Sequence, residues 1–176
     1  MTNSLSPESM SFPQAIAATQ SLMNQIQSNK LSEVEVQQRV SSILSSKNGG
    51  RGFFVAYLTS DMSLADNPST GVLNGLKSAT EISSELLVKN LAMSSAMVIT
   101  HRHNNDSESV AGSQKVCRRT CNLIQQLNLQ LIKKKLREIQ NTIENGTGEY
   151  QEFIERWDYS PKQKKAIQDS ISQLLT

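Results

Sequence analysis

The apolar residues of this chain recur mainly at the three- and four-residue spacings that place side chains on one face of an α-helix. The clearest series has spacings of 3, 4, 3 and 4 and consists of Leu129, Ile132, Leu136, Ile139 and Ile143. It predicts an amphipathic helix that packs on its neighbours. Asn145-Gly146 follows, and a glycine there is typical of a helix C-terminus.

The segment from residue 81 to about residue 101 is apolar on nearly all sides, which is typical of a central helix. We therefore expect it to form the core of the fold. Lys89, Asn90, Ser94 and Ser95 interrupt its apolar run. This run, residues 86–99, is shorter than the roughly 20 apolar residues that cross a membrane, so the sequence predicts no membrane span.

Several helix ends have recognisable polar signals. Ser32 with Glu35 matches a capping box, and Ser160-Pro161 pairs a capping residue with proline at the first helical position. Thr80 and Asp106 are expected to cap the two helices that follow them. The glycine-rich stretch 48–52 (NGGRG) is interpreted as a flexible break between helices.

The segment 53–59 (FFVAYLT) resembles a strand because it is short, aromatic and β-branched. It has no convincing partner strand, so we favour a helix, or an extended segment that packs on helices. The chain is therefore predicted to be all-α, with six to eight helices in an orthogonal or bundle-like array around the helix at 81–101. Residues 1–10 are expected to be a disordered leader, and residues 11–176 a single domain.

Composition and charge narrow the classes of function. The 176 residues include 18 Lys and Arg against 16 Asp and Glu, a net charge of +2 that gives nucleic-acid binding little support. The first ten residues contain no Lys or Arg and no apolar core, unlike a signal peptide. With only two cysteines, we expect a cytoplasmic protein with reduced thiols.

All of the histidines and cysteines fall in one region, and they are His101, His103, Cys117 and Cys121. Zinc prefers four nitrogen or sulfur ligands, so a metal- or thiol-dependent protein is one hypothesis. The spacings favour another interpretation, in which the cysteines are small buried hydrophobic residues and the histidines lie at a helix C-terminus. No cofactor is predicted.

Motifs of enzymatic chemistry are missing from the sequence. There is no nucleophile elbow, phosphate-binding loop or HExxH helix, and no pair of acids lies in an apolar context. The sequence therefore favours a protein that is not an enzyme.

Two regions are candidates for binding a partner. One is basic and contains Lys133, Lys134 and Arg137, although the favoured interpretation of this region is a solvated helix surface. The other is aromatic and contains Tyr150, Phe153, Trp157 and Tyr159. Its amphipathic spacing favours core packing over an exposed anchor. The leading hypothesis is a protein-interaction factor with a regulatory or assembly role. A weak nucleic-acid binder is a further alternative.

Three stretches of the chain resemble a known family. They are residues 53–67 (FFVAYLTSDMSLADN), residues 72–102 (VLNGLKSATEISSELLVKNLAMSSAMVITHR) and residues 155–159 (ERWDY). They are similar to a small, uncharacterised helical family found in cyanobacteria. The resemblance implies a bacterial cytoplasmic setting and assigns no catalytic residue or ligand.

Overall fold

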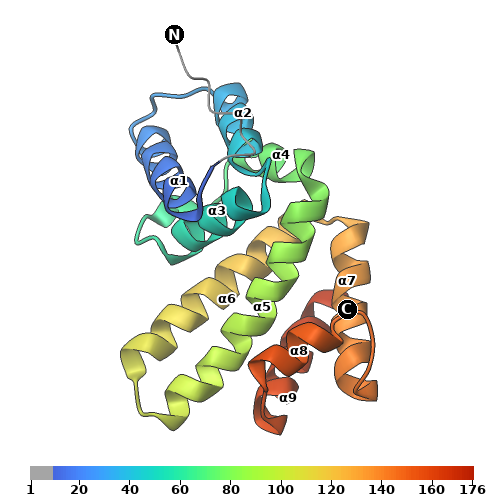
Figure 1. The fold of residues 1–176 in the computed structure, drawn as a ribbon. Helices are drawn as coiled ribbons and strands as arrows, with labels where there is room; N and C mark the ends of the chain where they lie inside the picture. Colours follow the sequence, from blue (N-terminus) through green and yellow to red (C-terminus); the bar gives the residue numbers. More distant parts are fainter. Residues whose placement is uncertain (1–9) are drawn as a thin grey trace. The chain divides into compact units, whose positions relative to one another are not determined.

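The computed structural model describes residues 10–176, and these contain nine α-helices, one short 3₁₀ helix and no strand (Figure 1). The prediction of an all-α fold is confirmed, with one helix more than expected. The predicted leader lies outside the described residues, apart from Met10.

The described residues form two compact units, 10–86 and 87–176, whose boundary falls inside helix α5. The interpretation of residues 11–176 as a single domain stays a prediction.

The first unit is built from two pairs of packed helices. Helix α1 packs on α3, and α2 packs on α4. The elements are α1 (Phe12–Gln27), α2 (Glu33–Ile43), α3 (Lys47–Thr59), η2 (Ser63–Ala65), α4 (Thr70–Ser78) and the beginning of α5 (Thr80–His103). Capping boxes at Ser11 and Ser32 fix the starts of α1 and α2, and the second of these was predicted.

Glycines allow the helices of each pair to approach closely. A Cβ added to Gly52 of α3 would lie 2.5 Å from the Cβ of Ala15 in α1. A Cβ added to Gly75 of α4 would lie 2.5 Å from the Cβ of Val40 in α2. Side chains at these positions would therefore force the helices of each pair apart.

The interpretation of residues 48–52 as a flexible break is wrong, because they form the first turns of α3. The Ser46 hydroxyl caps this helix by accepting a hydrogen bond of 3.0 Å from the Gly49 amide. Gly49, Gly50 and Gly52 are buried, so they serve close packing rather than flexibility.

The strand-like segment 53–59 is the second half of α3, so the helical alternative is confirmed and the extended one is wrong. Phe53 and Tyr57, four residues apart, stack with ring centroids 5.4 Å apart. Phe53, Phe54, Tyr57 and Leu58 are buried. Tertiary packing of these large side chains outweighs their preference for strands.

The second unit is organised around the rest of α5, which carries the buried residues Leu87, Val88, Leu91, Ala92 and Ala96. The prediction of a central apolar helix is confirmed. The other helices of this unit are α6 (Ser107–Leu127), α7 (Gln130–Asn145), α8 (Gln151–Trp157) and α9 (Pro161–Leu175).

The predicted cap at Thr80 is wrong. Helix α4 ends at Ser78 and α5 starts at Thr80, so there is no loop that would place Thr80 in a capping conformation. Its hydroxyl donates instead to the Lys77 carbonyl oxygen, at 2.6 Å. The predicted caps at Asp106 and Ser160 are confirmed, since each side chain accepts from the backbone amide three residues later.

Among residues 10–176, α5 is the one helix long and apolar enough to reach across a membrane. The mean hydropathy of its most apolar stretch is 1.2, and 56% of that stretch is buried within the protein. A core helix has the same properties, so this test gives only weak support to a membrane span.

Two glycine substitutions should change the stability in opposite directions, because Gly75 lies where α2 and α4 approach closely and Gly112 does not. Gly75→Ala should lower the free energy of unfolding by about 1–3 kcal/mol, because its Cβ would overlap Val40. Gly112→Ala in α6 has open space and should raise it by up to about 1 kcal/mol, since alanine favours helix. Urea unfolding followed by circular dichroism measures both. Equal shifts for the two variants would contradict the packing argument.

Candidate functional site

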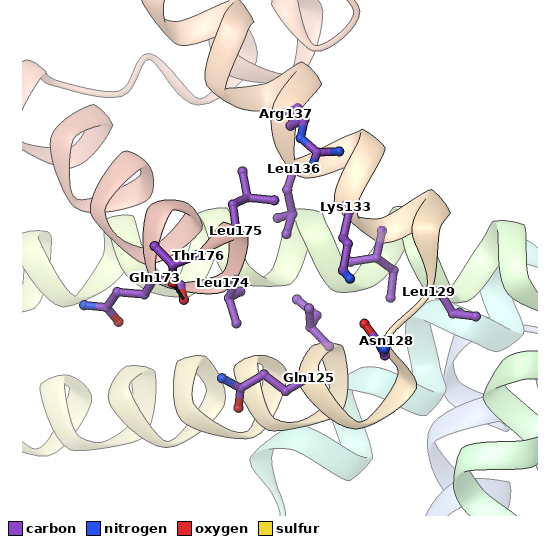
Figure 2. A pocket seen from close by; sticks show the side chains of 12 residues that line it. Gln125, Asn128, Leu129, Lys133, Leu136, Arg137, Gln173, Leu174, Leu175 and Thr176 are labelled. Carbon is purple, nitrogen blue, oxygen red and sulfur yellow. Dashed lines mark hydrogen bonds between the residues drawn. The ribbon is translucent and has the colours of Figure 1, made fainter.

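A groove opens in the second unit between the end of α6, the first half of α7 and the end of α9, and we call it the α7 groove (Figure 2). Its volume is about 450 Å³. The aliphatic lining consists of Ile124, Leu129, Ile132, Leu136, Leu174 and Leu175. Polar and charged side chains complete it, namely Gln125, Asn128, Lys133, Arg137, Gln173 and Thr176.

The periodicity of α7 explains why leucines and cations meet in this groove. Ile132, Leu136 and Ile139 form the buried seam that the sequence predicts. Lys133 and Arg137 each follow a seam residue and are four positions apart, so they lie on the same side of the helix. Figure 2 shows the Lys133 side chain extending from α7 into the groove.

The charged side chains that line the α7 groove are all cationic. Its twelve lining residues include two cationic side chains and no Asp or Glu. Within residues 10–176, neither Lys133 nor Arg137 makes an ion pair with a carboxylate. Lys134 does not line the groove and pairs with Glu138 at 3.6 Å. The structure therefore separates the predicted basic region into a groove pair and a solvated ion pair.

The predicted aromatic region is divided in the same way. Tyr150 and Tyr159 are 4% and 7% exposed, and the ring of Phe153 lies 6.3 Å from each of their ring centroids. The Lys89 ammonium lies 5.5 Å from the centre of the Phe153 ring. Trp157, in contrast, is 48% exposed. Three of the four rings form an internal cluster, and Trp157 faces solvent.

A second chemical feature surrounds the cysteines of α6, and we call it the thiol cluster: Cys117, Cys121, Ser94, Ser95 and Ser170. The Ser95 hydroxyl of α5 lies 3.6 Å from the Cys117 sulfur and 2.8 Å from the Ser170 hydroxyl of α9. Cys121 is one helical turn beyond Cys117, and both are partly exposed free thiols. Three helices thus bring hydroxyl and thiol groups together.

The two thiols differ strongly in acidity. A hydrogen bond from Cys121 lowers the pKa of Cys117 to about 6, against the effect of burial and with the help of the Ser95, Ser94 and Ser170 hydroxyls. The pKa of Cys121 is raised because its proton is held by that bond, and because burial and the Cys117 charge oppose a second thiolate. Cys117 is therefore the nucleophilic thiol at neutral pH.

Sequence reasoning identified both cysteines but missed their three serine partners. Ser94 and Ser95 stand as adjacent polar residues within an apolar helix, which is the signal that could have identified them. Ser170 gave no comparable signal, because it lies in a polar stretch of α9.

The histidines do not join the cysteines in a metal site. No three His, Cys, Asp or Glu side chains converge on a possible metal position anywhere in residues 10–176. Ser95 faces Cys117, and His101 lies six residues further along α5, about 9 Å along the helix axis. His101 and His103 occupy the last turn of α5, where positive charge is favourable.

The acidity difference predicts selective and pH-dependent alkylation. Iodoacetamide should modify Cys117 before Cys121, and the rate should rise with pH through a midpoint near 6 as the reactive thiolate forms. Ser95→Ala should move this midpoint upward, because it removes a hydrogen bond to the sulfur. Peptide mapping after timed alkylation measures both rates. Equal rates for the two cysteines, with a midpoint near that of a free thiol, would contradict the assignment.

Comparison with known proteins gives one finding. No curated protein and no solved structure matches the chain. One family matches residues 11–174, nearly the full length, and this agrees with the resemblance found in the sequence. The chain therefore belongs to the family described as "Uncharacterised conserved protein UCP020893".

Proposed function

We propose that this chain is a non-enzymatic protein-interaction factor with a regulatory or assembly role in the bacterial cytoplasm. Its partner is a helical protein segment that is aliphatic on one face and acidic beside it. The observation that carries the proposal is the α7 groove, where the unpaired cations Lys133 and Arg137 border a lining of leucines and isoleucines.

The aliphatic lining supports recognition of a partner helix. An amphipathic helix binds a groove through apolar residues at positions i, i+3, i+4 and i+7. Leu129, just before α7, and Leu174 and Leu175 on α9 line the groove and are partly exposed, so apolar surface is available on both sides. Burial of such surface favours binding by roughly 25 cal/mol for each Å² removed from water.

The charge pattern supports the choice of an acidic partner. Lys133 and Arg137 stand together with no Asp or Glu among the lining residues, so a basic segment would meet repulsion from these side chains and an acidic one attraction. Two cations beside an apolar floor differ from the extended basic surface that a nucleic-acid duplex needs. The nearly balanced net charge of +2 agrees with that distinction.

Charge reversal at Lys133 tests the proposal. The probes are two labelled helical peptides with leucines at i, i+3, i+4 and i+7, one flanked by glutamates and the other by lysines. The chain should prefer the glutamate peptide in fluorescence anisotropy. Lys133→Glu should lower the affinity for the glutamate peptide by about tenfold and raise the affinity for the lysine peptide, because the sign of one groove charge is reversed.

Lys162→Glu supplies the matched control for this experiment. Lys162 is exposed in the first turn of α9 and does not line the groove, while its substitution changes the net charge equally. It should leave the affinities for both peptides unchanged. Equal binding of the two peptides by the unmodified chain, or equal effects of the two substitutions, would overturn the proposal.

Trp157 is a second candidate contact because large apolar rings are rarely left 48% exposed and are frequent at interface hot spots. Trp157→Ala should reduce the partner protein recovered on the immobilised chain and change the free energy of unfolding by less than about 1 kcal/mol. Met97→Ala, at another exposed apolar residue of the second unit, should leave recovery unchanged. A large loss of stability in Trp157→Ala, with recovery proportional to folded protein, would assign Trp157 to the core.

A further inference from the structure

The thiol cluster is not explained by the proposed interaction function. It contains both cysteines of the chain, and neither lines the α7 groove. Cys117 and Cys121 are partly exposed, so small solutes can reach them. Ser94 and Ser95 are buried beside them, at 6% and 5% exposure. Buried hydroxyls in an apolar helix are costly unless they are hydrogen-bonded, and Ser95 bonds toward both Cys117 and Ser170.

We propose that Cys117 and Cys121 form a reversible dithiol–disulfide pair that is oxidised by hydroperoxides, with Cys117 as the attacking thiol and Cys121 as the resolving thiol. The proposal rests on their placement one turn apart on α6, on the Ser95–Ser170 hydroxyl pair beside Cys117 and on their access to solvent. It is independent of the proposed partner.

The first step oxidises Cys117. Its thiolate attacks one oxygen of the hydroperoxide, so an S–O bond forms as the O–O bond breaks. The sulfur loses two electrons and becomes a sulfenic acid, and the peroxide is reduced to water or an alcohol once the leaving oxygen takes a proton. The Ser95 hydroxyl lies beside the sulfur and can donate a hydrogen bond to the thiolate before attack.

The second step uses Cys121. Its sulfur attacks the sulfenic sulfur of Cys117, so an S–S bond forms and the S–O bond breaks. The hydroxide that leaves takes the Cys121 proton and becomes water. The negative charge on Cys117 disappears in the first step, which removes the hydrogen bond and the repulsion that raise the pKa of Cys121. The resolving thiol therefore becomes more reactive only after Cys117 has been oxidised.

The geometry of α6 allows a disulfide to form between Cys117 and Cys121, but only with strain. Residues four apart on a helix have Cα atoms about 6 Å apart, which lies within the range of disulfides. Their Cβ atoms are about 5–6 Å apart, whereas a disulfide needs about 3.5–4.5 Å. Closure must therefore distort one turn of α6. Strained disulfides are reduced easily, so a dithiol reductant should restore the thiols while it is oxidised to its own disulfide.

Hydrogen peroxide added to the reduced full-length chain tests the inference. We expect an intramolecular Cys117–Cys121 disulfide in peptide mapping, a loss of about one turn of helix in circular dichroism and recovery of both with dithiothreitol. In Cys121→Ser, dimedone should trap the sulfenic acid on Cys117. In Cys117→Ser, dimedone labelling should be slower, because burial still raises the pKa of Cys121 and the Ser95 hydroxyl lies beside position 117 rather than beside Cys121.

Several results would overturn the inference. They are thiols that stay reduced under peroxide doses that oxidise free cysteine, disulfides that form only between chains, and equal dimedone labelling in the two variants. A short competition of dimedone with closure in the unmodified chain keeps the test valid if a variant does not fold. There the adduct should form on Cys117, and an adduct mainly on Cys121 would overturn the assignment of roles.

Discussion

Burial of the apolar side of α5 is the constraint on which the second unit depends. Leu87, Leu91 and Ala96 are fully buried, and the helices around them must cover these residues to remove them from water. Gln163 of α9 is fixed to the same helix, since its side-chain amide donates to the Ala96 carbonyl oxygen and the Thr100 hydroxyl at 3.3 and 2.8 Å. The positions of the reactive and polar side chains on α6 and α9 therefore depend on how these helices cover the apolar side of α5.

The same constraint creates the thiol cluster. Ser94 and Ser95 share α5 with the apolar core, so burying the helix also buries their hydroxyls. Ser94 satisfies its hydroxyl within its own helix, by donating to the Asn90 carbonyl oxygen at 2.7 Å. Ser95 turns instead to α6 and α9, which places a hydroxyl beside Cys117. Ser95 makes α5 less apolar, but its hydroxyl gives Cys117 a polar neighbour that Cys121 does not share.

Local patterns were sufficient to predict most of the helices but not the way they pack. The seam of α7 and the caps at Ser32, Asp106 and Ser160 depend on residues within one turn, so sequence spacing identifies them. The glycines of α3 misled the prediction because their role is set by distant residues. Gly52 lies against Ala15, which is 37 positions away in the sequence. The spacing of residues within one segment does not reveal a contact this distant.

The candidate sites show the same difference between residues that can be found within one helix and partners that only the fold brings to them. Lys133 and Arg137 were identified from their own helix, but the groove beside them exists because the end of α9 brings Leu174 and Leu175 opposite α7. Cys117 and Cys121 were found as a helical pair, whereas Ser170 joins them only through the fold. The exposure of Trp157 beside the buried Tyr159 also depends on packing, since both belong to one amphipathic pattern.

Helix α6 connects the two features, because it carries the cysteine pair and, one turn beyond Cys121, the groove residues Ile124 and Gln125. A disulfide between Cys117 and Cys121 would strain the turn that immediately precedes these groove residues. Packed helices change between discrete arrangements rather than deforming smoothly. If a partner binds at the end of α6 and the cysteines in its middle are oxidised, both elements of a redox-controlled interaction lie on one helix.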